Sequence, residues 1–302
     1  MKILVTGKNG QLGSELQKTC PSNIELICFG SKELDISNAE QVNELITAHA
    51  PDIVINAAAY TAVDKAETDT ERAYAVNEQG AANLASACKN TNAKLIHIST
   101  DFVFDGTKTM PYEAGDATNP LGVYGASKLA GEQAISNVLG ADATIVRTAW
   151  VYSVFGNNFV KSMLNLMQQK DQLGIVVDQV GTPTWAASLA EMLWSLTAKN
   201  STQNDDVLSE NSNKAIIYHW TDAGVASWYD FAVAIQELAL DKGMLTKAIP
   251  ISPIPAVNYP TPAKRPAFSV IDKTEAEIAS GVKTIHWRKQ LSSMLDELKL
   301  NQ

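Results

Sequence analysis

The sequence has few cysteines and lacks any long apolar run. Its three cysteines, Cys20, Cys28 and Cys88, are spread widely over 302 residues. An odd number at this spacing fits neither a disulfide framework nor a zinc site, so we expect reduced thiols and a cytoplasmic protein. No apolar stretch is long enough to span a bilayer, and no signal sequence precedes the first apolar residues, so we expect no membrane partner.

Runs of basic residues, internal repeats and low-complexity segments are also absent. The net charge is −9, which argues against a general nucleic-acid binder. The hydrophobic fraction of 45% and the charged fraction of 19% are typical of a globular protein with one large or two modest domains. In so acidic a chain, a local cluster of cations indicates an anionic ligand.

What the first half does contain is an alternation of short apolar strands and helices. Strands are expected at residues 3–5, 24–29, 52–56 and 95–98, and helices at 14–18, 39–49 and 70–89. Continuous apolar strands that alternate with helices indicate a parallel sheet with helices on both faces. The sequence therefore predicts a doubly wound, Rossmann-like α/β fold.

Three glycines, Gly7, Gly10 and Gly13, follow the first strand and precede the first helix. Glycines at this place let the backbone approach a dinucleotide pyrophosphate, and the helix N-terminus offers free N–H groups to it. The alternative is an ordinary glycine-rich turn.

The end of the second strand bears on the choice of dinucleotide. NAD sites usually carry an acidic residue there, whereas this chain has Gly30, Ser31 and Lys32. No carboxylate would repel a 2′-phosphate, and Ser31 and Lys32 could hydrogen-bond to one. We therefore predict NADPH as the cofactor, with NADH as the alternative.

A tyrosine and a lysine stand four residues apart where a helix is expected to begin. Tyr124 and Lys128 would share one face of that helix, and a phenol beside an ammonium has a lowered pKa. Such a tyrosine can protonate a carbonyl oxygen as hydride reaches its carbon. The pair alone is weak evidence, and the dinucleotide motif upstream strengthens it. His97, inside an apolar strand, is interpreted as a core residue without a role.

After Tyr152 the alternation loosens. We expect a helix at 158–169, a strand at 174–180 that returns to the sheet, a helix at 186–197, a polar surface loop at 200–213 and a helix from Ser227. The predicted dinucleotide-binding domain is 1–150 with a returning segment of about 172–200. The predicted smaller substrate-binding lobe is 151–171 with 201–302.

The run from Tyr259 to Pro266 contains three prolines, which stiffen the segment that carries Lys264 and Arg265. Two fixed cations suit the pyrophosphate of a nucleotide sugar, which arginine can bind in a bidentate manner. The alternative is a proline-rich surface loop with two solvated charges.

These motifs carry a family resemblance. The glycine motif with Tyr124 and Lys128 resembles the extended short-chain dehydrogenase/reductases. The blocks 56–67, 99–106, 124–132, 147–152, 156–159 and 259–266 are similar, in order, to those of the dTDP-4-dehydrorhamnose reductases. This resemblance implies reduction of the C4 ketone of dTDP-4-dehydro-L-rhamnose by NADPH. The product, dTDP-L-rhamnose, feeds bacterial surface polysaccharides such as the O-antigen of lipopolysaccharide.

The resemblance also implies roles for particular residues. Tyr124 would donate the proton, Lys128 would lower its pKa and bind the nicotinamide ribose, and Thr100 would hydrogen-bond to the substrate carbonyl. Thr100, Asp101 and Trp150 would contact the sugar. The positions that match cofactor-lining residues are Gly10, Gln11, Leu12, Asp35, Ile36, Ala59, Tyr60, Thr61 and Ile98.

The chain departs from the family at a metal site. Some relatives bind magnesium across a dimer interface through glutamates; Glu15 matches one, but Ala187 stands at another. We therefore assign no metal ligand, leave Mg²⁺ open and expect a monomer or a homodimer.

Two rival functions remain open. One is a nucleotide-sugar epimerase or dehydratase, although Asp101 is followed by Phe102 rather than by the glutamate of dehydratases. The other is a non-catalytic subunit of the kind that binds methionine adenosyltransferase, which the set of Thr100, Tyr124 and Lys128 argues against.

Overall fold

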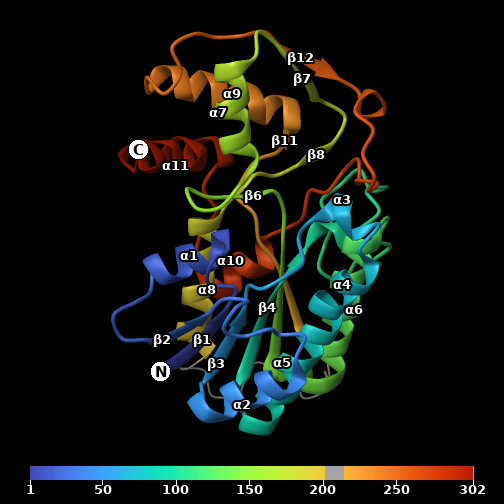
Figure 1. Ribbon diagram of the computed structural model, residues 1–302, viewed down its shortest axis with the longest axis vertical. Helices are drawn as coiled ribbons and strands as arrows, with labels where there is room; N and C mark the ends of the chain where they lie inside the picture. Colours follow the sequence, from blue (N-terminus) through green and yellow to red (C-terminus); the bar gives the residue numbers. More distant parts are fainter. Residues whose placement is uncertain (201–213, 302) are drawn as a thin grey trace.

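A computed structural model describes residues 1–200 and 214–301. Figure 1 shows an elongated molecule in two parts. The larger part is a parallel sheet covered by helices, and the smaller part, above it, consists of helices and short strands.

The central sheet has six parallel strands in the order β10-β5-β4-β3-β1-β2. They are β1 (Lys2–Thr6), β2 (Glu25–Phe29), β3 (Ile53–Asn56), β4 (Lys94–Thr100), β5 (Ala143–Thr148) and β10 (Ile216–His219). The predicted doubly wound α/β fold and its first four strands are thereby confirmed. The strand order changes direction between β1 and β3, and ligands of such folds bind at the carboxyl ends of the strands near that point.

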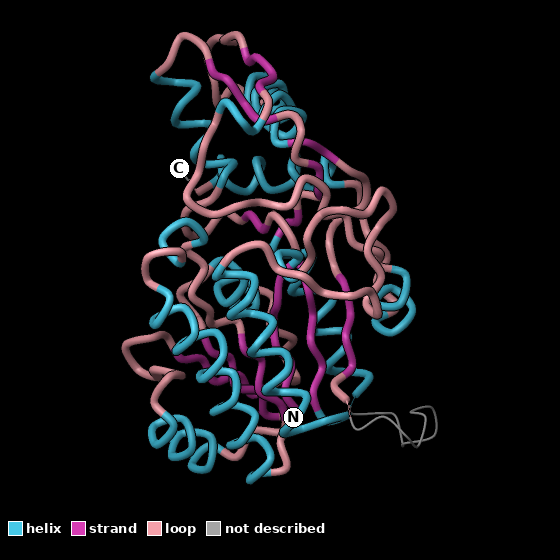
Figure 2. Tube along the Cα trace, turned by 90° about the vertical axis from the view of Figure 1, so that its right-hand side faces the viewer, coloured by secondary structure: helices cyan, strands magenta, loops and turns pink. Residues whose placement is uncertain are grey.

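Helices cover both faces of this sheet, and in Figure 2 they lie along the strands. One face carries α1 (Gln11–Lys18), α8 (Ala186–Asn200) and α10 (Thr274–Ser280), and the other carries α2 (Ala39–His49), α5 (Gly80–Thr91) and α6 (Val123–Leu139). Successive strand residues alternate between the two cores: Ile3 and Val5 pack toward α1 and α8, and Leu4 packs toward α2 and α5. Strands buried on both faces explain the unbroken apolar runs in the sequence.

The helix expected at 70–89 is interrupted. It consists of α4 (Thr70–Tyr74), a π-helical turn η1 (Ala75–Gln79) and α5. In this turn Asn77 is buried and accepts a hydrogen bond from the Tyr60 N–H at 2.9 Å. Asn77 also donates to the Tyr60 carbonyl at 3.1 Å and to Ser127 Oγ at 3.0 Å. The π turn thus connects the loop after β3 to α6.

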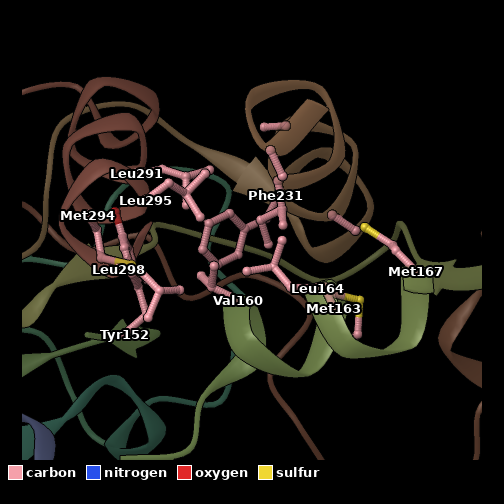
Figure 3. Packing of buried hydrophobic residues seen from close by; sticks show 14 of the residues in the cluster. Tyr152, Val160, Met163, Leu164, Met167, Phe231, Leu291, Met294, Leu295 and Leu298 are labelled. Carbon is pink, nitrogen blue, oxygen red and sulfur yellow. The ribbon is translucent and has the colours of Figure 1, made fainter. Parts of the chain in front are cut away.

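The smaller part is built on a second core, which Figure 3 shows from close by. Phe231 of α9 (Trp228–Asp241) packs among Val160 and Leu164 of α7 (Phe159–Gln169) and Leu291 and Leu295 of α11 (Trp287–Leu300). Both predicted helices are present, and the capping predicted at Ser227 is confirmed, since Ser227 forms a capping box with Asp230. The start of α7 is capped as well, because the side chain of Asn158 accepts from the Lys161 N–H.

Short elements complete the chain. The remaining strand pairs are β6 (Val151–Tyr152) with β9 (Thr184–Trp185), β7 (Leu173–Val176) with β12 (Ile251–Ile254), and β8 (Val180–Gly181) with β11 (Ala226–Ser227). The short helices are α3 (Val63–Ala66), η2 (Asp101–Val103), η3 (Gly140–Asp142) and η4 (Ala256–Asn258). Among the described residues, no helix combines the length and the apolarity needed to cross a membrane.

One prediction about the sheet is wrong. The segment 174–180 does not return to the central sheet, because β7 pairs with β12 in the smaller part and β8 pairs with β11. The edge of the sheet beside β5 is occupied by β10, which the sequence analysis did not predict. The predicted helix at 186–197 is confirmed as α8. Of the predicted loop at 200–213, residues 201–213 lie outside the described residues.

A buried ion pair fastens α6 to the sheet. The carboxylate of Glu132 on α6 accepts from Arg147 Nε on β5 at 3.0 Å and from Arg147 Nη2 at 2.7 Å. Ser99 Oγ of β4 donates to the same carboxylate at 2.5 Å. All three side chains are almost completely buried, so each charge depends on the other for solvation.

We expect Arg147→Met to lower the free energy of unfolding by about 3–5 kcal/mol, because it leaves Glu132 buried without a cation. Urea denaturation followed by circular dichroism measures this change. The double variant Arg147→Met/Glu132→Leu removes both charges and should recover much of the loss. A double variant less stable than Arg147→Met alone would contradict this account.

Candidate active site

Two adjoining cavities lie at the carboxyl ends of the strands, of about 590 Å³ and about 440 Å³. Gly10, Ala57 and Ala59 line both, so together they form one long space beside the glycine turn. An elongated space over the switch point of a doubly wound sheet has the shape that an extended dinucleotide requires.

The glycine turn is shaped by close backbone contacts. Gly7 has φ +76°, and a Cβ built on it would lie 2.7 Å from the Ala57 carbonyl carbon. A Cβ on Gly13 would lie 2.2 Å from the Gly7 carbonyl oxygen. Gly10 caps α1 without any side-chain hydrogen bond, so the helix presents free N–H groups at the shared part of the cavities. These features fit a pyrophosphate. Gly13 lines neither cavity and instead allows α1 to approach the turn.

The smaller cavity contains several of the predicted cofactor residues. Its lining includes Gly7, Ser31, Asp35, Ile36, Ala59 and Tyr60. Lys32 does not line it, whereas Arg72 of α4 does. Arg72 Nη2 lies 3.8 Å from Asp35 Oδ2. Hydrogen bonds from Ser37 are the main cause of the lowered pKa of Asp35, to which the charge of Arg72 adds. The sequence analysis missed Arg72, because nothing local connects α4 to the end of β2.

The larger cavity brings together Thr100, Tyr124 and Lys128, which come from the end of β4 and the first two turns of α6. Gln11, Leu12, Thr61, Ile98, Asp101 and Trp150 line it as well. Thr100 Oγ1 donates to Asp101 Oδ1 at 3.1 Å and accepts from the Phe102 N–H at 3.2 Å. The Phe102 ring packs edge-on against Tyr124, with ring centroids 5.5 Å apart. A phenol, an amino group and an alcohol therefore border one space.

The predicted lowering of the Tyr124 pKa by Lys128 is not found in this arrangement. Burial of the phenol raises the pKa of Tyr124 to about 12; a hydrogen bond with Thr100 acts against this rise, and the charge of Asp101 adds to it. Lys128 Nζ is directed elsewhere, to the Ile98 carbonyl at 2.7 Å and to His97 Nε2 at 3.1 Å. Burial lowers the pKa of Lys128 to about 8, against the opposing charge of Glu132.

Trp150 has a strained backbone, with φ +47°. Its ring stacks on Trp228 of the smaller part, with centroids 3.5 Å apart and planes 7° apart. A Cβ built on Gly181 would lie 2.8 Å from that ring, so the Trp150 indole is confined on more than one side. Asp101, which lines the same cavity, is buried, and burial raises its pKa to about 6.

The side chains of Lys264 and Arg265 have different surroundings. Lys264 is exposed, whereas Arg265 Nη2 lies 2.8 Å from Asp64 Oδ2 and Arg265 Nη1 lies 3.0 Å from Asp64 Oδ1. Arg265 also lines a third cavity, of about 530 Å³, with Trp228 and Tyr259. The ion pair links the C-terminal segment to α3, and this contact could not be foreseen from local sequence.

Glu15, which matches a magnesium ligand of some relatives, is buried in α1. Its carboxylate accepts a hydrogen bond from Ser153 Oγ at 2.7 Å, and burial raises its pKa. In residues 1–200 and 214–301, no group of three histidine, cysteine or carboxylate side chains is placed to hold a metal ion.

Comparison with known proteins now adds to this geometry. A family model described as the RmlD substrate binding domain matches residues 1–300. The dTDP-4-dehydrorhamnose reductase of Aggregatibacter actinomycetemcomitans is 39% identical over 295 residues, which cover 97% of this chain and 98% of that protein. The chain belongs to the dTDP-4-dehydrorhamnose reductase family.

Solved structures of this family superpose over nearly the full length. A dTDP-4-dehydrorhamnose reductase from Clostridium acetobutylicum has a TM-score of 0.88 at 40% identity and covers 99% of this chain and 100% of its own. One from Bacillus anthracis, solved in complex with NADP, has a TM-score of 0.88 at 33% identity and covers 98% of this chain and 99% of its own. The extended short-chain frame predicted from the motifs is therefore confirmed.

We expect Gly7→Ala to weaken NADPH binding at least about tenfold, because an alanine at φ +76° is strained and its Cβ meets the Ala57 backbone. Quenching of protein fluorescence on titration with NADPH measures the Kd. Gly115→Ala is the matched control, since a Cβ there meets nothing within 4 Å. Equal affinities for NADPH in both variants would show that the turn does not approach the cofactor.

Proposed function

We propose that this protein reduces the C4 ketone of dTDP-4-dehydro-L-rhamnose with NADPH and releases dTDP-L-rhamnose. The observation that carries the proposal is the convergence of Thr100, Tyr124 and Lys128 on one cavity beside the glycine turn. Family membership supports the substrate, and the NADP complex of the Bacillus anthracis relative supports the cofactor.

In the proposed mechanism each of these side chains has a separate role. When bound, NADPH supplies the hydride that reduces the ketone carbon. Tyr124 gives its phenolic proton to the ketone oxygen, and Thr100 hydrogen-bonds to that oxygen as negative charge develops on it. Lys128, once charged and turned toward Tyr124, favours the phenolate that remains. Asp101 and Trp150 border the same space and would orient the sugar.

We propose that the two parts of the molecule hold different ligands. Residues 1–150, with α8 and β10, would bind the dinucleotide, since they form the sheet, its helices and most of the lining of both cavities. The smaller part would cover the nucleotide sugar. Arg265 is paired with Asp64, so it would bind a pyrophosphate either while keeping part of that ion pair or after breaking it. Lys264, which is exposed, would reach the same group from solvent.

The direct test follows the loss of NADPH absorbance at 340 nm with dTDP-4-dehydro-L-rhamnose and with other nucleotide keto-sugars. Stoichiometric oxidation with the rhamnose precursor, and formation of dTDP-L-rhamnose, are expected. An epimerase or dehydratase recycles its bound cofactor, so product without net NADPH oxidation would replace this proposal with that class. A folded chain that neither oxidises NADPH nor changes any of the sugars would favour a non-catalytic role.

Tyr124→Phe should lower kcat by about 10²- to 10⁴-fold while the Kd for NADPH stays within about twofold, because only the proton donor is removed. Steady-state kinetics and fluorescence titration measure the two quantities. Tyr152→Phe, in the core of the smaller part, is the control for loss of a buried hydroxyl elsewhere. Full activity in Tyr124→Phe would exclude Tyr124 as the acid.

Arg72→Ala should lower the preference for NADPH over NADH, taken as the ratio of their kcat/KM values, by about 10- to 100-fold. Arg72 is the cation that borders the smaller cavity, and a charged hydrogen bond to a 2′-phosphate is worth roughly 1.5–3 kcal/mol. Lys32→Ala, which alters a cation outside the cavity lining, should change the ratio less. An equal fall for both cofactors in Arg72→Ala would assign the guanidinium to the adenine instead.

A further inference from the structure

His97 occupies a buried position behind the proposed catalytic residues. It lies on β4 between Asn56 of β3 and Lys128 of α6, and only 1% of its surface is exposed. Its Nδ1 is 2.9 Å from Asn56 Nδ2, and its Nε2 is 3.1 Å from Lys128 Nζ. The imidazole therefore connects a fixed amide to the lysine of the site.

The surroundings of Asn56 determine which nitrogen of His97 carries the proton. The Ala58 backbone N–H donates to Asn56 Oδ1 at 3.1 Å, and Thr6 Oγ1 donates to the same oxygen at 2.7 Å. A backbone N–H cannot accept, so this side of the amide must be its oxygen and the NH₂ group must face His97. His97 Nδ1 then accepts a hydrogen bond, and the neutral ring carries its hydrogen on Nε2.

This tautomer has a consequence for Lys128. The Nε2–H points at Nζ, and an ammonium has three donors and no lone pair to accept it. A neutral amine, by contrast, can accept from His97 and donate to the Ile98 carbonyl, which lies 2.7 Å away. An imidazolium does not relieve the conflict, since burial and the nearby lysine lower the pKa of His97 well below its usual value.

Other charged groups around Lys128 oppose this effect only weakly. Glu132, one turn along α6, favours the ammonium, but its carboxylate is already paired with Arg147. Asp101 and Tyr124 border the same cavity. Glu67, which follows α3, accepts from the Val123 N–H at the start of α6.

We propose that His97 is a positioning residue that favours the neutral amine form of Lys128, so that dinucleotide binding in alkaline solution is coupled to the uptake of a proton by Lys128. The proposal rests on the proposed function only in requiring a dinucleotide. Negative phosphates and ribose hydroxyls supply the charge and the acceptors that an ammonium lacks beside His97. Lys128 then takes a proton from solvent and acts as the cation beside Tyr124.

Calorimetry of NADPH binding in two buffers with different ionisation enthalpies tests the coupling without any sugar, so a failed reductase assay leaves this test intact. At pH 8.5 the protein should take up about three quarters of a proton, the neutral fraction of a group whose pKa is about 8. The NADPH Kd should rise about tenfold per pH unit above that pKa, because the neutral amine must be protonated. No uptake at pH 8.5 in the wild-type protein would overturn the proposal.

Two variants separate the two sides of the imidazole. Gln can place an amide oxygen where Nε2 lies and accept from an ammonium, whereas Asn reaches only the Nδ1 position. His97→Gln should therefore cut proton uptake at pH 8.5 at least about twofold and move the alkaline rise in Kd upward by about one pH unit. His97→Asn, which removes the Nε2–H but supplies no acceptor, should cut the uptake less than His97→Gln does. His49→Gln, at the end of α2, is the control for loss of a histidine outside the site.

A second measurement keeps the test decisive if the variants fail to fold. The ¹⁵N chemical shifts of the histidine rings in the wild-type protein distinguish a ring protonated on Nε2 from one protonated on Nδ1. His97, whose Nδ1 faces Asn56, should be protonated on Nε2. An Nδ1–H tautomer would overturn the proposal, as would a His97→Gln protein with wild-type proton uptake.

Discussion

The buried contact between Glu132 and Arg147 is the constraint on which the rest of the site depends. Glu132 shares its carboxylate between Arg147 of β5 and Ser99 of β4. Away from water, neither charge has another ion-pair partner within the described residues, so the pair fixes the position of α6 relative to the two strands. The residue after Ser99 is Thr100, and Tyr124 and Lys128 lie one to two turns before Glu132. The position of the reactive groups thus follows from a contact that touches no ligand.

Much of the fold could be predicted because its signals are local. Apolar strands, the spacing of Gly7, Gly10 and Gly13, and the four-residue step from Tyr124 to Lys128 each lie within one segment. The pairing of strands, by contrast, depends on segments that are far apart in the sequence. β7 is apolar enough for either sheet, and only its pairing with β12 decides its place. The family resemblance supplied the residues that local reasoning could not connect to the site, such as Asp35 and Trp150.

The misses have one physical cause, which is contact between residues far apart in the chain. Arg265 meets Asp64 across 201 positions, and Arg72 reaches a cavity formed by the end of β2. His97 was dismissed because a histidine in an apolar strand is usually a satisfied core residue. It is satisfied, as expected, but one of its partners is Lys128. His97 is thus a hydrogen-bonded core residue and also a partner of a proposed catalytic residue, whereas sequence reasoning treats these two interpretations as alternatives.

The π turn at Ala75–Gln79 has a consequence for how the chain tolerates changes in length. It accommodates one residue more than an unbroken α-helix would need between α4 and α5. Deleting one residue there would let α4 and α5 continue as one regular α-helix with both flanking segments in place, but it would remove the turn that positions Asn77. The apolar face of α5 would stay on the sheet, whereas Asn77 would turn away from Tyr60 and Ser127. The number of residues between the loop after β3 and α5 is therefore fixed by the contacts of the π turn, although α4 and α5 are ordinary α-helices.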